Sequence, residues 1–81
     1  MQITVRINGV LASKIGLSRL SINLSPPATI QDLHQQLQSQ YPQLSPEIGR
    51  AVAVIGGVHQ AKTAVLQDGQ EVALLVPIAG G

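Results

Sequence analysis

The sequence predicts an α+β domain of two layers, in which one main helix packs on one face of a mixed β-sheet. Three observations lead to this prediction: alternating apolar and polar residues near the N-terminus, one amphipathic helical segment, and apolar runs bounded by turn signals in the second half. Strands with a single helix between them typically fold in this way. We expect residues 1–81 to form a single domain, because 81 residues with 44% hydrophobic side chains fill one modest core.

The first two strands are predicted by a strict alternation of side chains. Residues 2–8 place apolar side chains at every second position, which is the period of a half-buried strand. The same period returns over residues 20–24, after a connection that contains Gly9 and Gly16. We expect these two strands to pair as a hairpin.

A helix is predicted to follow the stop signal Ser25-Pro26-Pro27. Thr29 is placed to cap the helix, and Asp32, three positions later, completes a variant of the capping box. Apolar residues then recur at helical spacing until Pro42 ends the run, so the expected helix spans residues 30–41. Its buried stripe is Ile30, Leu33 and Leu37.

The segment 43–50 is expected to be a loop with one short turn that directs Leu44 and Ile48 inward. Residues 51–55 are apolar throughout, which indicates a buried strand. The side chains that we expect to face the helix from the sheet are Ile3, Val5, Ile7, Leu20, Ile22, Val52 and Val54.

Turn signals divide the rest of the chain. Gly56-Gly57 predicts a tight turn before a weakly patterned short strand, and residues 67–70 predict a second turn. Residues 71–76 are the last expected strand, which ends at Pro77 and leaves residues 77–81 as a flexible tail with a Gly-Gly end.

Composition argues against several classes of function. A net charge of +1 with one Tyr and no Phe or Trp offers no basic face and no stacking surface for nucleic acid. The absence of cysteine excludes disulfides and thiolate chemistry. Charged residues interrupt the apolar N-terminal stretch, so neither a signal peptide nor a membrane span is expected. We therefore expect a soluble, cytoplasmic protein that binds neither nucleic acid nor membrane.

No conventional active site is expected within the domain. The two histidines, His34 and His59, are far apart in the sequence and are interpreted as ordinary surface or boundary residues. The few carboxylates are explained as cap, loop and turn residues, so no metal site and no intrinsic cofactor are predicted. An enzyme that works alone is not expected.

The unusual feature is the Gly80-Gly81 end. Two residues without Cβ can pass through a narrow channel, and the carboxylate of Gly81 is unhindered and ionised at neutral pH. Such a carboxylate can attack the α-phosphate of ATP held by a partner, and exchange of AMP for sulfide then gives a thiocarboxylate. Gly81 is therefore the candidate reactive residue, and Gly80 is needed to reach it. A frayed end or a cloning remnant is the alternative explanation.

The last fourteen residues, Asp68-Gly69 to Gly80-Gly81, resemble the end of the MoaD/ThiS sulfur-carrier family, nearest to the small subunit of molybdopterin synthase. The resemblance implies a ubiquitin-like β-grasp fold over the whole chain. Three features depart from that subunit: Gln70 in the turn, Leu74-Leu75 in the last strand, and Val76-Pro77 before the tail. Ile78-Ala79 also occurs in thiamin sulfur carriers, so thiamin or another sulfur-transfer pathway stays open.

The resemblance also implies partners. An ATP-dependent E1-like activating enzyme would adenylate Gly81, a sulfur donor would supply the sulfur, and the large catalytic subunit of molybdopterin synthase would receive the tail during molybdenum cofactor biosynthesis. This chain would be the sulfur-donating, non-catalytic subunit. The alternatives are a β-grasp adaptor with an inert end and a covalent protein tag.

The last strand suggests where partners bind. Both of its sides are apolar, and one helix covers only one face of a sheet, so the row of Ala73, Leu75 and Pro77 is expected to be exposed. The alternative is a central strand whose second side is covered by residues 43–50. The candidate partner-binding residues are Leu75, Pro77, Ile78 and Ala79.

Overall fold

The computed structural model describes residues 1–77, which contain one mixed sheet of five strands in the order β2-β1-β5-β3-β4. Only β1 and β5 pair in parallel, and the other neighbours are antiparallel. The order of strands and main helix along the chain agrees with the prediction. The strands are β1 (Gln2–Ile7), β2 (Arg19–Asn23), β3 (Val52–Ile55), β4 (Val58–Gln60) and β5 (Glu71–Leu75).

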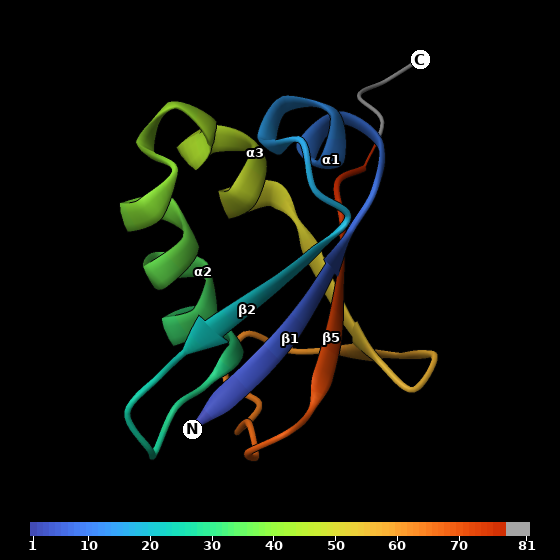
Figure 1. Cartoon of the computed structure of the whole chain (residues 1–81). Coiled ribbons are helices and arrows are strands. Elements are labelled where there is room, and N and C mark those ends of the chain that lie inside the picture. Colours follow the sequence, from blue (N-terminus) through green and yellow to red (C-terminus); the bar gives the residue numbers. More distant parts are fainter. Residues whose placement is uncertain (78–81) are drawn as a thin grey trace.

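The main helix α2 (Ile30–Gln40) and the short helix α3 (Ser45–Arg50) lie on the same side of the sheet (Figure 1). A short 3-10 turn, η1 (Pro42–Leu44), joins them. The capping box at the start of α2 is as predicted: the Thr29 amide donates to Asp32 Oδ2 at 2.8 Å, and the Asp32 amide donates to Thr29 Oγ1 at 3.3 Å. The helix therefore begins where its two cap residues satisfy the first free amides.

A further helix, α1 (Gly9–Ile15), was not predicted. It lies in the connection between β1 and β2, which do pair antiparallel as expected. The helix buries Leu11 in the core and ends at Gly16, whose φ of 87° suits a glycine. With seven residues, the segment is too short for helical periodicity to stand out in the sequence.

The core lies between the sheet and the helices α2 and α3, and most of its predicted members are buried. The prediction for β3 is wrong, because Val52 and Val54 do not face the helices. Instead Ala53 is buried opposite Leu74, and Val52 and Val54 are only half-buried. A run that is apolar at every position carries no alternation, so the pairing with β5 decides which side chains point inward.

Residues 42–50 pack on the helix side of the sheet, because Leu44 and Ile48 belong to the same core as Leu33 and Leu37. The side-chain amide of Gln38 donates through Nε2 to the Ser45 backbone carbonyl at 3.0 Å and links α2 to α3. These residues therefore do not cover the opposite face, although β5 is indeed central. In residues 1–77 no helix lies on that face (Figure 1), and none is long and apolar enough to cross a membrane.

Candidate functional site at the root of the tail

Strand β5 leads the chain from the middle of the sheet to the tail. It is held by β1 on one side and β3 on the other, and Val72 and Leu74 are fully buried. The strand therefore fixes the position from which the tail departs. It ends beside α1 (Figure 1), and Pro77 is the last described residue. The predicted site residues Ile78, Ala79, Gly80 and Gly81 lie outside the described residues.

The first surface at this root is the open face of the sheet. The register places Leu75 opposite Val52 and Ala73 opposite Val54, so four apolar side chains form one patch. We call Val52, Val54, Ala73 and Leu75 the open-face patch. Leu75 is 41% exposed, in agreement with the expected open row, and Pro77 is exposed as well. Sequence reasoning found two members of the patch, Ala73 and Leu75, and misplaced the two valines of β3.

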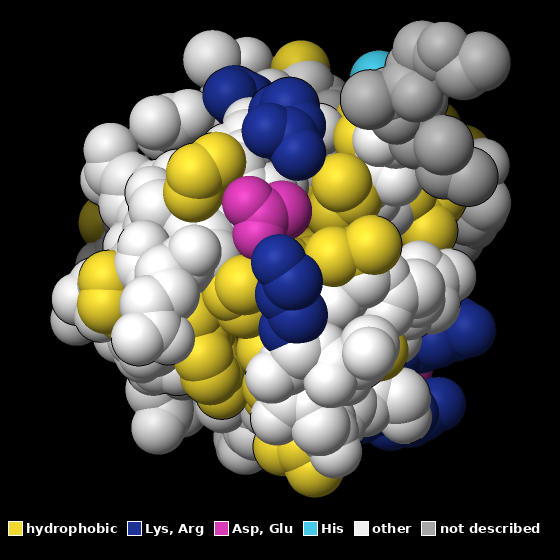
Figure 2. Space-filling model, turned by 90° about the horizontal axis from the view of Figure 1, so that it is seen from above, with side chains coloured by type: hydrophobic (Ala, Val, Ile, Leu, Met, Phe, Trp, Pro, Cys, Tyr) yellow, Lys and Arg dark blue, Asp and Glu magenta, His cyan; other side chains and the backbone are white. Residues whose placement is uncertain are grey.

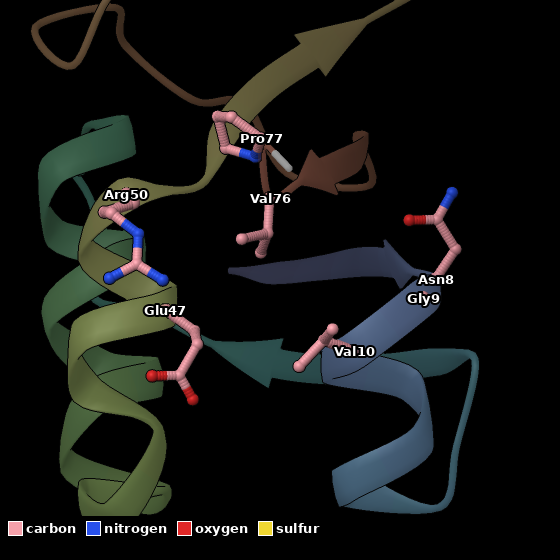
Figure 3. A pocket seen from close by; sticks show the side chains of 7 residues that line it. All are labelled: Asn8, Gly9, Val10, Glu47, Arg50, Val76 and Pro77. Carbon is pink, nitrogen blue, oxygen red and sulfur yellow. The ribbon is translucent and has the colours of Figure 1, made fainter. Parts of the chain in front are cut away.

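The second surface is a groove of about 570 Å³ at the end of the sheet. Figure 3 shows the side chains of Val10 and Val76 directed into the space between α1 and α3, with Glu47 and Arg50 extending from α3. We call this the tail-root groove. Its lining residues are Asn8, Gly9, Val10, Glu47, Arg50, Val76 and Pro77.

Charges surround the tail-root groove. Lys14 Nζ on α1 lies 3.5 Å from Glu47 Oε2 on α3, which ties the two helices together across the groove. Figure 2 shows this end of the molecule, with an acidic group between basic groups and hydrophobic side chains around them. The sequence did not indicate this groove, because its lining comes from three segments that only the tertiary fold brings together.

The two histidines of the domain lie in different environments. Within residues 1–77 no three His, Asp or Glu side chains are arranged to hold a metal ion. His59 is exposed on β4, as expected, but His34 is only 3% exposed, and its ring nitrogens have no hydrogen-bond partner among the described residues. Burial, and after it the charge of Lys62, lower the pKa of His34 below its ordinary value of 6.5.

We expect the domain to lose stability when the pH falls below about 6.5, because the unfolded chain then binds a proton at His34 that the folded protein binds less readily. The loss should level off once the pH lies below the folded-state pKa. Urea unfolding between pH 7.5 and 5 measures this slope. His34→Leu should flatten it, whereas the exposed control His59→Gln should keep it. An unchanged slope in His34→Leu would assign the pH dependence to other groups.

The fold and the root of the tail define a class of small carrier proteins with a ubiquitin-like β-grasp. The family model described as the ThiS family matches residues 5–81, and the chain therefore belongs to the ThiS family. This confirms the resemblance to MoaD/ThiS proteins, which are small carriers rather than catalysts in their own right. A search of curated protein sequences found no significant match.

Solved structures agree with the fold. SAMP1 from Haloferax volcanii superposes with a TM-score of 0.84 at 21% identity, and each chain covers 100% of the other. A putative molybdopterin converting factor, subunit 1, from Pyrococcus furiosus gives 0.84 at 19% identity, covering 96% of this chain and 99% of that one. Subunits 1 and 2 of the molybdopterin-converting factor from Helicobacter pylori form a complex, in which the matching chain gives 0.66 at 21% identity with 100% coverage of both chains. The mixed sheet with its packed helix is thus the ubiquitin-like β-grasp of these proteins.

Proposed function

We propose that the chain is a sulfur carrier whose C-terminal Gly81 is adenylated and then converted to a thiocarboxylate. The observation that carries the proposal is the extent of the family match, which runs through residue 81 and so includes both terminal glycines. The described domain supports it, because β5 is held on both sides and offers its end as a fixed root for the tail.

The proposed chemistry needs no catalytic side chain from this domain. A carboxylate oxygen of Gly81 attacks the α-phosphate of ATP, an acyl-phosphate bond forms, and pyrophosphate leaves. Sulfide then attacks the acyl carbon, the bond to the AMP oxygen breaks, and AMP leaves. The product is a thiocarboxylate, and no group is oxidised or reduced. ATP and the catalytic groups belong to an E1-like activating enzyme, and the sulfide comes from a separate sulfur donor.

For the acceptor we propose molybdopterin synthase, with this chain as its small, non-catalytic subunit in the cytoplasm. Two of the similar structures are a putative subunit 1 of a molybdopterin converting factor and a molybdopterin-converting factor in which subunits 1 and 2 form a complex. The large catalytic subunit would bind the tail and pass the sulfur to a pterin precursor, after which water returns Gly81 to the carboxylate. Thiamin biosynthesis or another sulfur-transfer pathway is the alternative within the same chemistry.

A second candidate is covalent protein tagging, in which Gly81 forms an isopeptide bond to a lysine. The similarity to SAMP1, a small archaeal modifier protein, supports covalent tagging as this second candidate. Both functions begin with the same adenylate and differ in the nucleophile that attacks it. A β-grasp adaptor with an inert end would need neither the adenylate nor a nucleophile that attacks it.

Intact-mass spectrometry of the chain, co-expressed with its activating enzyme, tests these functions. A gain of about 16 Da, the difference between sulfur and oxygen, identifies the thiocarboxylate. A ladder of conjugates identifies tagging, and an unchanged mass favours the adaptor. Reconstitution of the thiocarboxylate form with the large subunit and a pterin precursor then tests the molybdopterin pathway against the thiamin one.

Leu75→Glu is expected to weaken binding to both the activating enzyme and the tail acceptor by a few kcal/mol, because it places a charge in a desolvated interface. The free domain should keep its melting temperature, since Leu75 is exposed. Isothermal titration calorimetry measures both affinities.

The matched control for Leu75→Glu is Val65→Glu, which adds the same charge at an exposed apolar residue outside the strands. It should leave both affinities unchanged. Unchanged affinity in Leu75→Glu, or unfolding of the free variant, would contradict the assignment of the open-face patch as a partner surface.

A further inference from the structure

The root of the tail offers two surfaces that point in different directions. Side chains alternate along an extended chain, so Leu75 belongs to the open-face patch, whereas Val76 lines the tail-root groove. Pro77 lines the same groove and is the residue from which the tail continues. A protein that takes Gly81 into its active site must therefore come close to the tail-root groove, whichever other surface it uses.

The groove carries one positive charge, on Arg50, that has no ion-pair partner among residues 1–77. Glu47 is half-buried and paired with Lys14, so these two charges compensate one another. Arg50 is exposed, and the structure gives its guanidinium no carboxylate within 4 Å among residues 1–77. A guanidinium at the edge of a groove is suited to bind a carboxylate through two parallel hydrogen bonds.

The rest of the lining is suited to an apolar side chain. Val10 is 52% exposed on the first turn of α1, and its side chain and that of Val76 are directed into the groove (Figure 3). A volume of about 570 Å³ is within the range of sites that hold small ligands or a few side chains of a peptide. Exposed apolar side chains around such a hollow mark an interaction site.

We propose that the tail-root groove binds a short peptide segment of the protein that takes Gly81 into its active site. This segment carries a carboxylate next to an apolar side chain. Arg50 pairs with the carboxylate, and the apolar side chain packs between Val10 and Val76. The charge balance favours a peptide over nucleic acid, because within the described part of the chain the groove has a single unpaired cation, and the net charge is only +1. The identity of the partner rests on the proposed function, whereas the chemistry of the groove does not.

An NMR titration of the ¹⁵N-labelled chain tests the groove directly. The probe is a short peptide, acetylated and amidated at its ends, with a leucine next to a glutamate, and the comparison probe has glutamine instead of glutamate. The acidic peptide should bind in the millimolar range, as expected for so small a ligand, and should shift the amide signals of Gly9, Val10, Arg50 and Val76. The signals of Ala73 and Leu75 should not move.

Two variants and one control separate the contributions. Arg50→Gln should lower the affinity for the acidic peptide about fivefold and abolish the preference for the acidic over the glutamine peptide. Val10→Ser should lower the affinity for both peptides. The control Lys62→Gln removes the same charge from an exposed residue at the loop packed on the start of α2, and it should bind like the unmodified chain.

The proposal is overturned if neither peptide shifts the groove signals, if Arg50→Gln binds both as before, or if the shifts occur on the open-face patch. Groove signals that depend on protein concentration without peptide would indicate a second copy of the chain as the occupant. Groove signals that move on removal of residues 78–81 would indicate the chain's own tail, and either result also overturns the proposal. Because the titration needs no modification of Gly81, its failure is distinct from an unchanged mass in the thiocarboxylate experiment.

Discussion

Deleting Gly81, or adding one residue after it, is expected to abolish sulfur transfer while leaving the melting temperature nearly unchanged. The reacting carboxylate belongs to the last residue, and a change of one residue displaces it by about 3.5 Å from the position that the activating enzyme requires. Stability should not change, because every residue of the buried core lies between Ile3 and Leu74. Loss of sulfur transfer without loss of stability would show that the C-terminal end is needed for the reaction and not for folding.

Single-turnover transfer to the acceptor, followed by intact mass, measures this effect. The extended protein should still bind the activating enzyme, since the open-face patch and the tail-root groove are unaltered. Gly80→Ala is a graded variant that keeps the length and adds one Cβ, and it should slow transfer rather than abolish it. Normal transfer by the extended protein would show that Gly81 is not the reacting residue.

Leu33→Ala is expected to lower the free energy of unfolding by about 2 to 5 kcal/mol. Leu33 is 0% exposed on α2, where its neighbours are the buried side chains of the sheet and of α3. Removing its side chain opens a cavity that the surrounding core cannot fill. Small domains have total stabilities of only about 5 to 15 kcal/mol, so the loss is a large share of the whole.

Urea unfolding at pH 7.5 measures the loss in Leu33→Ala. The matched control is Leu17→Ala, which makes the same change at an exposed leucine and should cost less than about 0.5 kcal/mol. If Leu33→Ala does not fold, Leu33→Met keeps the volume and should cost less than about 1.5 kcal/mol. A loss below about 0.5 kcal/mol in Leu33→Ala would show that the stripe on α2 does not support the core.

Local patterns were sufficient for the elements whose partners lie nearby in the sequence. The alternation over residues 2–8 and 20–24 predicted β1 and β2, and the pair Thr29 and Asp32 marked the start of α2. The turn at Gly69, with a φ of 85°, was predicted from its Asp-Gly sequence. The resemblance of the chain end to a sulfur-carrier family also rested on sequence and was confirmed by the family match.

The errors have a common physical cause. Val52 and Val54 were assigned to the wrong side because β3 is apolar throughout, and only its pairing with Leu75 and Ala73 decides which side chains are buried. His34 was assigned to the surface or its boundary, yet it is buried, and Lys62, whose loop accepts hydrogen bonds from the first amides of α2, lies close enough to lower its pKa. In both cases the burial of a residue depends on segments far away in the sequence.

The main helix, the two N-terminal strands and the Gly-Gly end could be recognised from local sequence, because each depends on residues within a few positions of one another. The folded domain was needed to show that β5 is central, that the open-face patch includes Val52 and Val54, and that Val10, Arg50 and Val76 line one groove. Contacts between distant segments form when apolar surface is buried against whichever element lies opposite. Which element lies opposite depends on the topology of the whole chain, so it cannot be predicted from a local pattern.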